Sequence, residues 1–293
     1  MWQSLHFCMK YIKTLRLTPK GGSRMIYYFT GTGNSLDVAK RLAALLDDTV
    51  RLMDIHEPQP VIESAPSIGF VVPVHNFDIP DAVKDWFRRV RFSGSFGQTY
   101  FYGLITYGGA EGNARANLRR ACLKKGWDLV FNTMVMVPDN AGPIIRRPYD
   151  LTSLYTLDER LARIAEAVKG RRRSHEEEPY SYKMALKTEL SKIYLDSPVV
   201  AMKIDYHRCI RCRLCERLCP VENMYFKETK KKKDKAAKAR KSYAGKMKLR
   251  GHCIHCLACI HWCPTGAIRM GYIDFMNRQY TNPYVNVREL LKR

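Results

Sequence analysis

Two cysteine runs with the same spacing constrain this chain more than any other feature of its sequence. The runs "CIRCRLCERLCP" (209–220) and "CIHCLACIHWCP" (253–264) both follow C-x2-C-x2-C-x3-C-P. In such a run, thiolates on a tight loop reach one cubane, and the last cysteine, at the start of the next helix, reaches another. The spacing therefore predicts two [4Fe-4S] clusters with crossed ligands, cluster I on Cys209, Cys212, Cys215 and Cys263 and cluster II on Cys253, Cys256, Cys259 and Cys219.

Other uses of the cysteines fit the pattern less well. Structural zinc sites typically pair C-x2-C units across a longer loop, and three cysteines spaced by two crowd one tetrahedral ion. A cluster for radical chemistry does not need a duplicated motif with crossed ligands, which suits electron relay. The flanking His252, His255 and His261 are interpreted as neighbours of the ligands, because the cysteine set is already complete. Cys8 and Cys122 are interpreted as ordinary thiols.

The chain before the cysteine runs alternates strand-like and helix-like segments. Nearly continuous apolar runs predict strands at 25–30, 67–74, 100–108 and 130–137, as expected where helices cover both faces of a parallel sheet. Apolar residues at helical spacing predict helices at 36–46, 79–90, 113–126 and 157–170. The alternation implies a right-handed, doubly wound α/β domain with a five-stranded parallel sheet over about residues 25–170.

The loop after the first predicted strand, "TGTGNS" (30–35), combines hydroxyls and glycines at a helix N-terminus. It lacks the Gly-Lys-Ser/Thr ending of a P-loop, and Leu36 stands where a dinucleotide fingerprint needs its third glycine. Backbone N–H groups and hydroxyls there can hold a phosphate monoester without a basic side chain, as in a flavodoxin that holds FMN. An ordinary capped helix start is the alternative. The loop consists of Thr30, Gly31, Thr32, Gly33, Asn34 and Ser35.

Two further loops leave the same edge of the predicted sheet. In a flavodoxin-like sheet of order 2-1-3-4-5, the flavin lies outside the carboxyl ends of the strands, near the switch point between strands 1 and 3. Glycines let the backbone approach a flat ring, and Phe77 and Tyr107 are candidates to stack on it. The predicted FMN site therefore also includes Pro73, Val74, His75, Asn76, Phe77, Thr106, Tyr107, Gly108, Gly109 and Gly112.

With "MIYYFTGTGNS", "TYGGAEGNA", "VPDN" after the last strand and "CIHCLACIHWCPTGAI", the chain resembles the EFR1 family of flavodoxin-ferredoxin fusion proteins over about residues 25–285. The resemblance implies a flavodoxin-like domain followed by a small α+β two-[4Fe-4S] ferredoxin-like domain, with FMN and both clusters in one electron-transfer protein. It does not define a substrate. The chain departs from the family pattern at His75 and Asn76, where aromatic residues are more usual, and in a long basic segment between the motifs.

The net charge of +22 is concentrated in two segments. Residues 227–250 contribute +10 (12 − 2), residues 1–24 contribute +5, and the rest of the chain contributes +7 (22 − 10 − 5). The segment 227–250 is interpreted as an insert in the ferredoxin-like domain, with part of it able to form a basic helix. We interpret the insert first as a solvated loop and second as a docking element for an acidic redox partner. A nucleic-acid contact comes third, because Tyr243 is the only aromatic residue of the insert.

The remaining segments complete the predicted organisation. We expect an N-terminal extension at 1–24, disordered or from a wrongly chosen start codon, a linker and connector helix at 171–200, the ferredoxin-like domain at 201–275, and a tail at 276–293. No run of about 18 apolar residues predicts a membrane helix. Cysteines spaced for metal ligation indicate a reducing compartment, and so a cytoplasmic protein without membrane insertion.

Joining a flavin site to a pair of clusters has a chemical logic. Clusters pass single electrons, whereas flavin exchanges one or two and can release a hydride. The leading hypothesis is an electron-transfer iron-sulfur flavoprotein that serves a redox partner protein. One alternative is an FMN-dependent reductase of a small organic substrate, with a proton donor such as His75 or Tyr107. The other is a nucleic-acid-associated iron-sulfur protein that uses the basic insert.

Overall fold

The central sheet of the first domain is parallel and has the predicted strand order. The computed structural model describes residues 24–94, 97–142, 149–174, 178–228, 245–271 and 278–291. The sheet runs β2-β1-β4-β6-β7, and every neighbouring pair in it is parallel. Numbered along the chain, its strands therefore follow the flavodoxin-like order 2-1-3-4-5. They span Met25–Tyr28 (β1), Thr49–Leu52 (β2), Ser67–Pro73 (β4), Tyr100–Tyr107 (β6) and Leu129–Met136 (β7).

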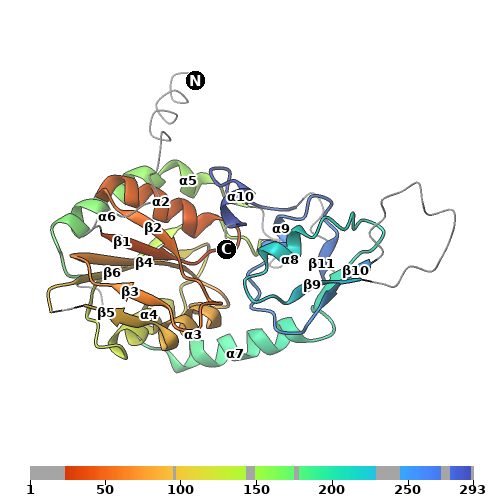
Figure 1. The fold of residues 1–293 in the computed structure, drawn as a ribbon, viewed down its shortest axis with the longest axis horizontal. Coiled ribbons are helices and arrows are strands. Elements are labelled where there is room, and N and C mark those ends of the chain that lie inside the picture. The colour runs from red at the N-terminus through yellow and green to blue at the C-terminus, as the bar shows by residue number, and fades with distance from the viewer. Residues whose placement is uncertain are drawn as a thin grey trace, which may run out of the picture.

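Helices cover both faces of this sheet (Figure 1). On one face, α2 (Asn34–Leu46) and α6 (Leu157–Lys169) share a hydrophobic core with β1 and β6. On the other face, α3 (Asp81–Arg89) and α4 (Ala114–Leu123) enclose an aromatic core that contains Trp86 and Phe70. A short helix α5 (Thr152–Tyr155) precedes α6, and β3 (Val61–Glu63) pairs with β5 (Arg91–Ser93) beside the main sheet. The predicted doubly wound domain is confirmed.

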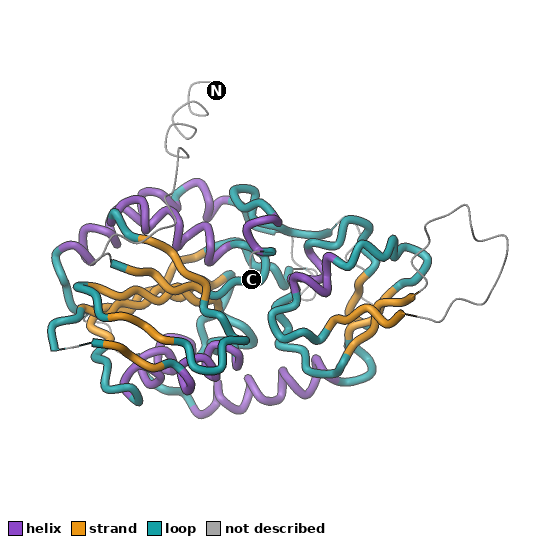
Figure 2. Tube along the Cα trace, viewed as in Figure 1, coloured by secondary structure: helices purple, strands orange, loops and turns teal. Residues whose placement is uncertain are grey.

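The second domain is smaller (Figure 2), and its described residues form two antiparallel strand pairs and two short helices. A long helix, α7 (Tyr182–Asp196), leads into it from the first domain. Strand β8 (Met202–Ile204) pairs with β11 (Ile268–Met270), and β9 (Met224–Glu228) pairs with β10 (Gly245–Leu249). Helix α8 (Leu214–Leu218) and helix α9 (Ala258–His261) each follow one cysteine loop. Their small core includes Leu195, Met224, Met247, Ile260 and Ile268.

Two segments differ from their predicted roles. The ends of the predicted insert 227–250 belong to the β9–β10 hairpin, where Glu228 pairs with Gly245, so they are part of the fold. The remainder, 229–244, and with it the predicted basic helix, lies outside the described residues, as does 1–23. The C-terminal segment 278–291, called the tail segment below, returns to the first domain and ends in α10 (Val287–Leu290). Val285 and Leu290 join the core of α2 and α6.

The described part of the chain has no membrane-spanning candidate. None of its helices is both long enough and apolar enough to cross a bilayer.

Candidate redox site

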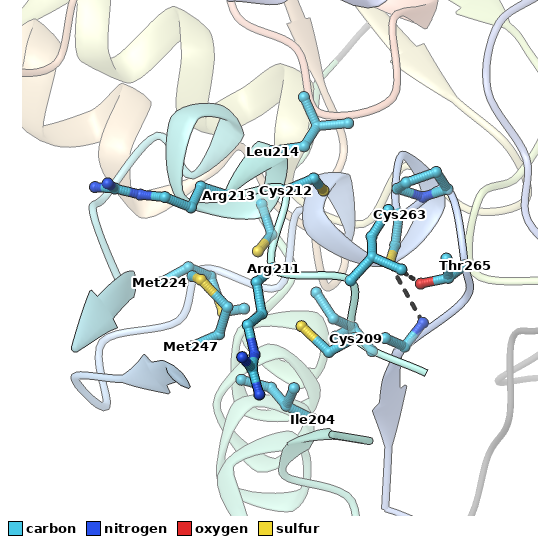
Figure 3. Close-up of a pocket in the computed structure, with 15 residues that line it drawn as sticks. Ile204, Cys209, Arg211, Cys212, Arg213, Leu214, Met224, Met247, Cys263 and Thr265 are labelled. Carbon is cyan, nitrogen blue, oxygen red and sulfur yellow. Dashed lines mark hydrogen bonds between the residues drawn. The ribbon is translucent and has the colours of Figure 1, made fainter. Parts of the chain in front are cut away.

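The structure brings Cys209, Cys212, Cys215 and Cys263, the four cysteines predicted for cluster I, around one pocket (Figure 3). Met224 and Met247 from the β9–β10 hairpin complete its apolar wall. The Sγ of Cys263 accepts a hydrogen bond from the backbone N–H of Ala267 at 3.3 Å. Burial, followed by the charges of Cys263, Cys212 and Cys209, raises the pKa of the Cys215 thiol to about 12. Binding of iron by these thiols must therefore release protons.

The cysteines predicted for cluster II also converge. Burial raises the pKa of the Cys259 thiol, and the charges of Cys256, Cys253 and Cys219 add to the effect in that order. Backbone N–H groups already point at two of these sulfurs, from Asn223 to Cys219 at 3.1 Å and from His255 to Cys253 at 3.3 Å. Such N–H···S bonds tune the potential of a bound cluster. The crossed assignment of ligands stays a prediction.

The donor set fits clusters rather than isolated ions. Within the described ranges, no three His, Cys, Asp or Glu side chains lie close enough together to hold a single metal ion. The sulfurs are instead spread around the pocket that Cys209, Cys212, Cys215 and Cys263 line. Thiolate ligands distributed over a loop and the start of the following segment suit a cubane, whose irons each need one of them.

The two cysteine loops have the same backbone turn. Arg211 and Arg213 in the first loop have φ of 60° and 60°, and the equivalent His255 and Leu257 in the second have 53° and 59°. This left-handed conformation is uncommon for residues with a side chain. It recurs because each loop must turn all of its sulfurs inward within a few residues. The duplicated spacing is therefore a duplicated structure.

The predicted phosphate loop, residues 30–35, lies at the start of α2. The side chains of Thr30, Thr32, Asn34 and Ser35 are buried. Gly33 has φ of 107°, and its N–H donates to the Thr30 Oγ1 at 3.1 Å. No side chain caps the first turn of α2, so the helix N-terminus presents backbone N–H groups of the kind that bind phosphate. The loop thus carries suitable donors for the FMN phosphate.

The second cysteine loop and the tail segment cover this phosphate loop. A β-carbon at Gly31 would collide with the carbonyl oxygen of Cys256, and one at Gly33 would crowd Asn282 and Val285. The Tyr280 hydroxyl donates to the Asn34 Oδ1 at 2.6 Å, and the Asn282 amide donates to the same oxygen at 3.1 Å. Contact with the second domain therefore requires glycine at position 31.

The second predicted flavin loop also reaches the second domain. Pro73 ends β4, and the Val74 N–H donates to the Thr106 carbonyl at 2.9 Å. His75 hydrogen-bonds with the backbone of Ile254 beside the second cysteine loop, while its Nδ1 is buried without a partner. Burial, followed by the charge of His255, lowers the pKa of His75 to about 4. His75 is therefore neutral near pH 7 and packs between the domains.

Asn76 and Phe77 shape the rest of that loop. Their φ values of 50° and 65° turn the chain sharply, and the Phe77 carbonyl accepts from the Asn113 N–H at 2.8 Å. Gly112 lies so close to this carbonyl that a β-carbon there would overlap it. The Lys187 Nζ of α7 lies 4.2 Å from the centre of the Phe77 ring. The predicted stacking partner thus faces the connector helix.

The third predicted loop follows β6. The Thr106 hydroxyl lies 2.8 Å from the Ser35 hydroxyl, which joins this loop to the phosphate loop. Tyr107 is half-buried. Gly108 packs against Asp139, whereas Gly109 has only that residue's carboxylate at ordinary contact distance. All three predicted loops therefore meet at the carboxyl edge of the sheet, as the topology requires.

A cavity of about 220 Å³ lies between the domains, and no residue of the three predicted flavin loops lines it. The first domain contributes Phe29 and Met53 at the ends of β1 and β2, and the second contributes Cys219 and Pro220. Cys219 belongs to the predicted cluster II set. That set therefore faces the first domain.

Comparison with known proteins separates the two halves of the chain. Residues 208–267 match the family model of a 4Fe-4S dicluster domain, so the C-terminal part is a 4Fe-4S ferredoxin-type domain. No curated protein sequence matches the chain.

Solved structures match the first half at low identity. They include a flavodoxin from the domain Archaea (15% identity, 50% of this chain and 99% of that chain, TM-score 0.30). Others are a Streptococcus pneumoniae flavodoxin (14%, 51% and 98%, TM-score 0.34) and an FMN-dependent NADH-azoreductase from Bacillus anthracis in complex with FMN (13%, 50% and 99%, TM-score 0.35). TM-scores this low carry no argument about the fold. The strand order of the parallel sheet defines the flavodoxin-like fold by itself.

Sequence reasoning missed three residues at this site. Tyr280 and Asn282 contact the phosphate loop from the tail segment, and the Asn140 carbonyl lies 2.8 Å from the Nε2 of His261 across the domain boundary. The tail segment has no apolar periodicity, and its partners lie about 250 residues away. The motif "VPDN" (137–140) was the only sequence signal near any of them.

Proposed function

We propose that this protein is an electron-transfer iron-sulfur flavoprotein, which relays electrons between two [4Fe-4S] clusters and an FMN. The carrying observation is the contact between Gly31 of the phosphate loop and Cys256 of the second cysteine loop. Cys256 is a predicted ligand of cluster II. With no residue between this ligand and the flavin phosphate loop, the two predicted cofactor sites share one boundary.

The polar groups that would hold FMN are the backbone N–H groups at the start of α2 and the hydroxyls of Thr30, Thr32 and Ser35. All of these side chains are buried, so they are ordered before any ligand arrives. A bound FMN would supply the exchange between single electrons and hydride that clusters alone lack. The residues of the second and third loops, from Pro73 to Phe77 and from Thr106 to Gly112, would border the ring.

The placement of His75 favours the carrier over the reductase. A reductase of a small substrate needs a proton donor facing that substrate. The His75 ring is engaged with the backbone of Ile254, and its pKa is lowered to about 4. Near pH 7 His75 is therefore neutral and lacks the imidazolium proton that a general acid transfers. Tyr107 stays a candidate donor. The nucleic-acid alternative depends on the core of the basic insert, residues 229–244, which lie outside the described residues.

Anaerobic purification followed by iron, sulfide and flavin quantification tests this proposal. We expect about eight irons and one FMN per chain. Zinc in place of iron would contradict the cluster prediction, and iron without flavin would contradict the relay. A cytoplasmic location follows from the same proposal, because air-sensitive clusters with thiolate ligands need a reducing compartment.

Two ligand variants sharpen the test. Cys212→Ala removes a predicted cluster I ligand and Cys256→Ala a predicted cluster II ligand, so each protein should keep about half of the iron. We expect rapid-mixing experiments with dithionite to show that flavin reduction by the remaining cluster persists in C212A and is lost in C256A. The two variants serve as controls for each other, and equal flavin reduction in both would contradict the proposed order of sites.

A further inference from the structure

The first cysteine loop, residues 209–213, presents an open surface. Cys212 is exposed although it is a predicted ligand, and so are Arg211 and Arg213 on either side of it. Ile210 is 63% exposed, which is high for an apolar side chain in a loop of this kind. Figure 3 shows the Arg213 side chain extending away from the sulfurs of the pocket.

The same positions in the second cysteine loop are buried. Cys256 is 8% exposed and contacts Gly31 of the first domain, whereas Leu257 is 4% exposed and lies in the core of the second domain itself. Ile254, the equivalent of Ile210, packs against the aromatic core of the first domain. Since the two loops have the same turn, the difference lies in what each contacts. The second cysteine loop contacts the first domain of the same molecule. Among the described residues, no other part of the molecule covers the equivalent face of the first cysteine loop.

The charge around the first cysteine loop is positive. Residues 205–217 contain four arginines against Asp205 and Glu216, which gives +2 (4 − 2). The neighbouring strand β10, whose Met247 lines the same pocket, adds Lys246 and Lys248 and no acid. Arg213 pairs with Glu216 at 2.6 Å and Arg208 with Asp205 at 3.4 Å, and the two arginines beyond these pairs leave the segment with its positive sign. The arginines are Arg208, Arg211, Arg213 and Arg217.

We propose that this loop is the docking surface for an acidic one-electron carrier protein, with Ile210 at its centre and Arg211 and Arg213 on its rim. An apolar centre inside a charged rim is the usual composition of a transient interface, and complementary charge raises the association rate. One electron passes between the reduced partner and the oxidised cluster on the Cys212 side. The partner loses what the cluster gains, and no bond forms or breaks. The inference rests on the proposed function.

Binding of a small acidic [2Fe-2S] ferredoxin, used as the probe, tests the docking surface. We expect the double variant R211E/R213E to associate about 10-fold to 100-fold more slowly than wild type at low ionic strength, and the difference to shrink in high salt. The variant R211Q/R213Q should fall between the two. The matched control is R163E/R172E, which makes the same charge change on exposed residues of the first domain. Stopped-flow kinetics and calorimetric titration provide the readouts.

Three outcomes would overturn the proposal. These are equal association by wild type and R211E/R213E, an equal loss in the control R163E/R172E, and tighter wild-type binding of basic cytochrome c than of the acidic ferredoxin. Iron content, measured for every variant, verifies that the clusters are intact. If the protein contains the clusters and flavin and transfers electrons internally, but R211E/R213E associates as fast as wild type, only the docking proposal is refuted. A protein without flavin would sink the relay and leave the binding result interpretable.

Discussion

The two cysteine loops have one spacing and one backbone turn, yet they face opposite surroundings. The second loop is buried against the first domain, and Cys256 touches Gly31 there. The first loop, around Cys212, faces solvent. Between the ligands, the first loop carries Arg211 and Arg213 where the second carries His255 and Leu257. The cysteines therefore define the cofactor, while the residues between them define what each loop meets.

Because of this difference in burial, the two equivalent cysteine motifs occupy distinct positions, one facing the first domain and one facing solvent. A pair of equivalent clusters has no inner and outer member until one side is closed. Here Ile254 and Trp262 of the second cysteine run pack against the cores of the first domain and close that side. Leu214 of the first run also packs there, so the open face is confined to residues 210–213. The burial of the two cysteine loops thus distinguishes an inner from an outer loop, which the identical cysteine spacing does not.

Among the substitutions proposed here, Gly31→Ala should have the largest effect, because it disturbs the contact that distinguishes the second cysteine loop from the first. The added β-carbon collides with the Cys256 carbonyl, so the domains must separate or strain. We expect a loss of about 1–3 kcal/mol in the free energy of unfolding and slower electron transfer between the domains. Gly97→Ala is the matched control, because a β-carbon at Gly97 meets nothing within 4 Å. Denaturant unfolding and small-angle scattering measure both variants, and equal stability of the two would refute the close contact.

The pH dependence of stability should come next in size, through His75. Burial lowers its pKa from 6.5 to about 4, with His255 adding to the effect and the Ile254 backbone and Asp81 opposing it. Below pH 6.5 the unfolded chain binds a proton that the folded chain does not. Stability therefore falls as the pH falls toward 4, by up to about 1.4 kcal/mol per pH unit.

His75→Gln should remove that part of the slope. Denaturant unfolding of wild type and variant between about pH 7 and 5.5 gives the comparison. Parallel slopes for the two proteins would show that His75 is not held neutral between the domains.

Tyr280→Phe should give the smallest effect. It removes the hydroxyl that donates to Asn34, and Asn34 keeps its bond from Asn282. We expect a loss of about 1 kcal/mol in the free energy of unfolding, together with faster proteolysis of the tail segment. Tyr284→Phe is the control, because Tyr284 is 45% exposed and keeps its ring contact with Arg41. Identical unfolding midpoints would show that the tail segment does not hold the phosphate loop.

Much of the fold was predictable because it rests on local periodicity. Apolar runs at 67–74 and 100–108 are buried central strands, and the helices at 36–46 and 157–170 face the same core. The turn of each cysteine loop is also local, although Cys263 of the second motif reaches the pocket of the first loop. The strands, the helices and the loop turns depend on residues that are close together in sequence.

The contacts between the domains were not predictable in the same way. Gly31 was predicted as part of a phosphate loop, and nothing in the sequence indicated that its near neighbour is the Cys256 carbonyl. The hydrogen bond of His75 to the Ile254 backbone had no signal in the sequence around position 75. The segment 227–250 read as an insert because charge obscured the alternation of β9 and β10. Each case depends on a residue far away in the chain.

The tail segment gives this molecule a particular order of assembly. The phosphate loop forms at the start of the chain, and its cover, Tyr280 and Asn282, is synthesised after the whole second domain. Domains generally fold in the order in which they are made. The loop of the first domain thus stays uncovered on the ribosome while the cysteine loops are being built, and closing it is a late step. A cofactor that binds there has its best opportunity during synthesis, and release from the finished protein requires the tail segment to open first.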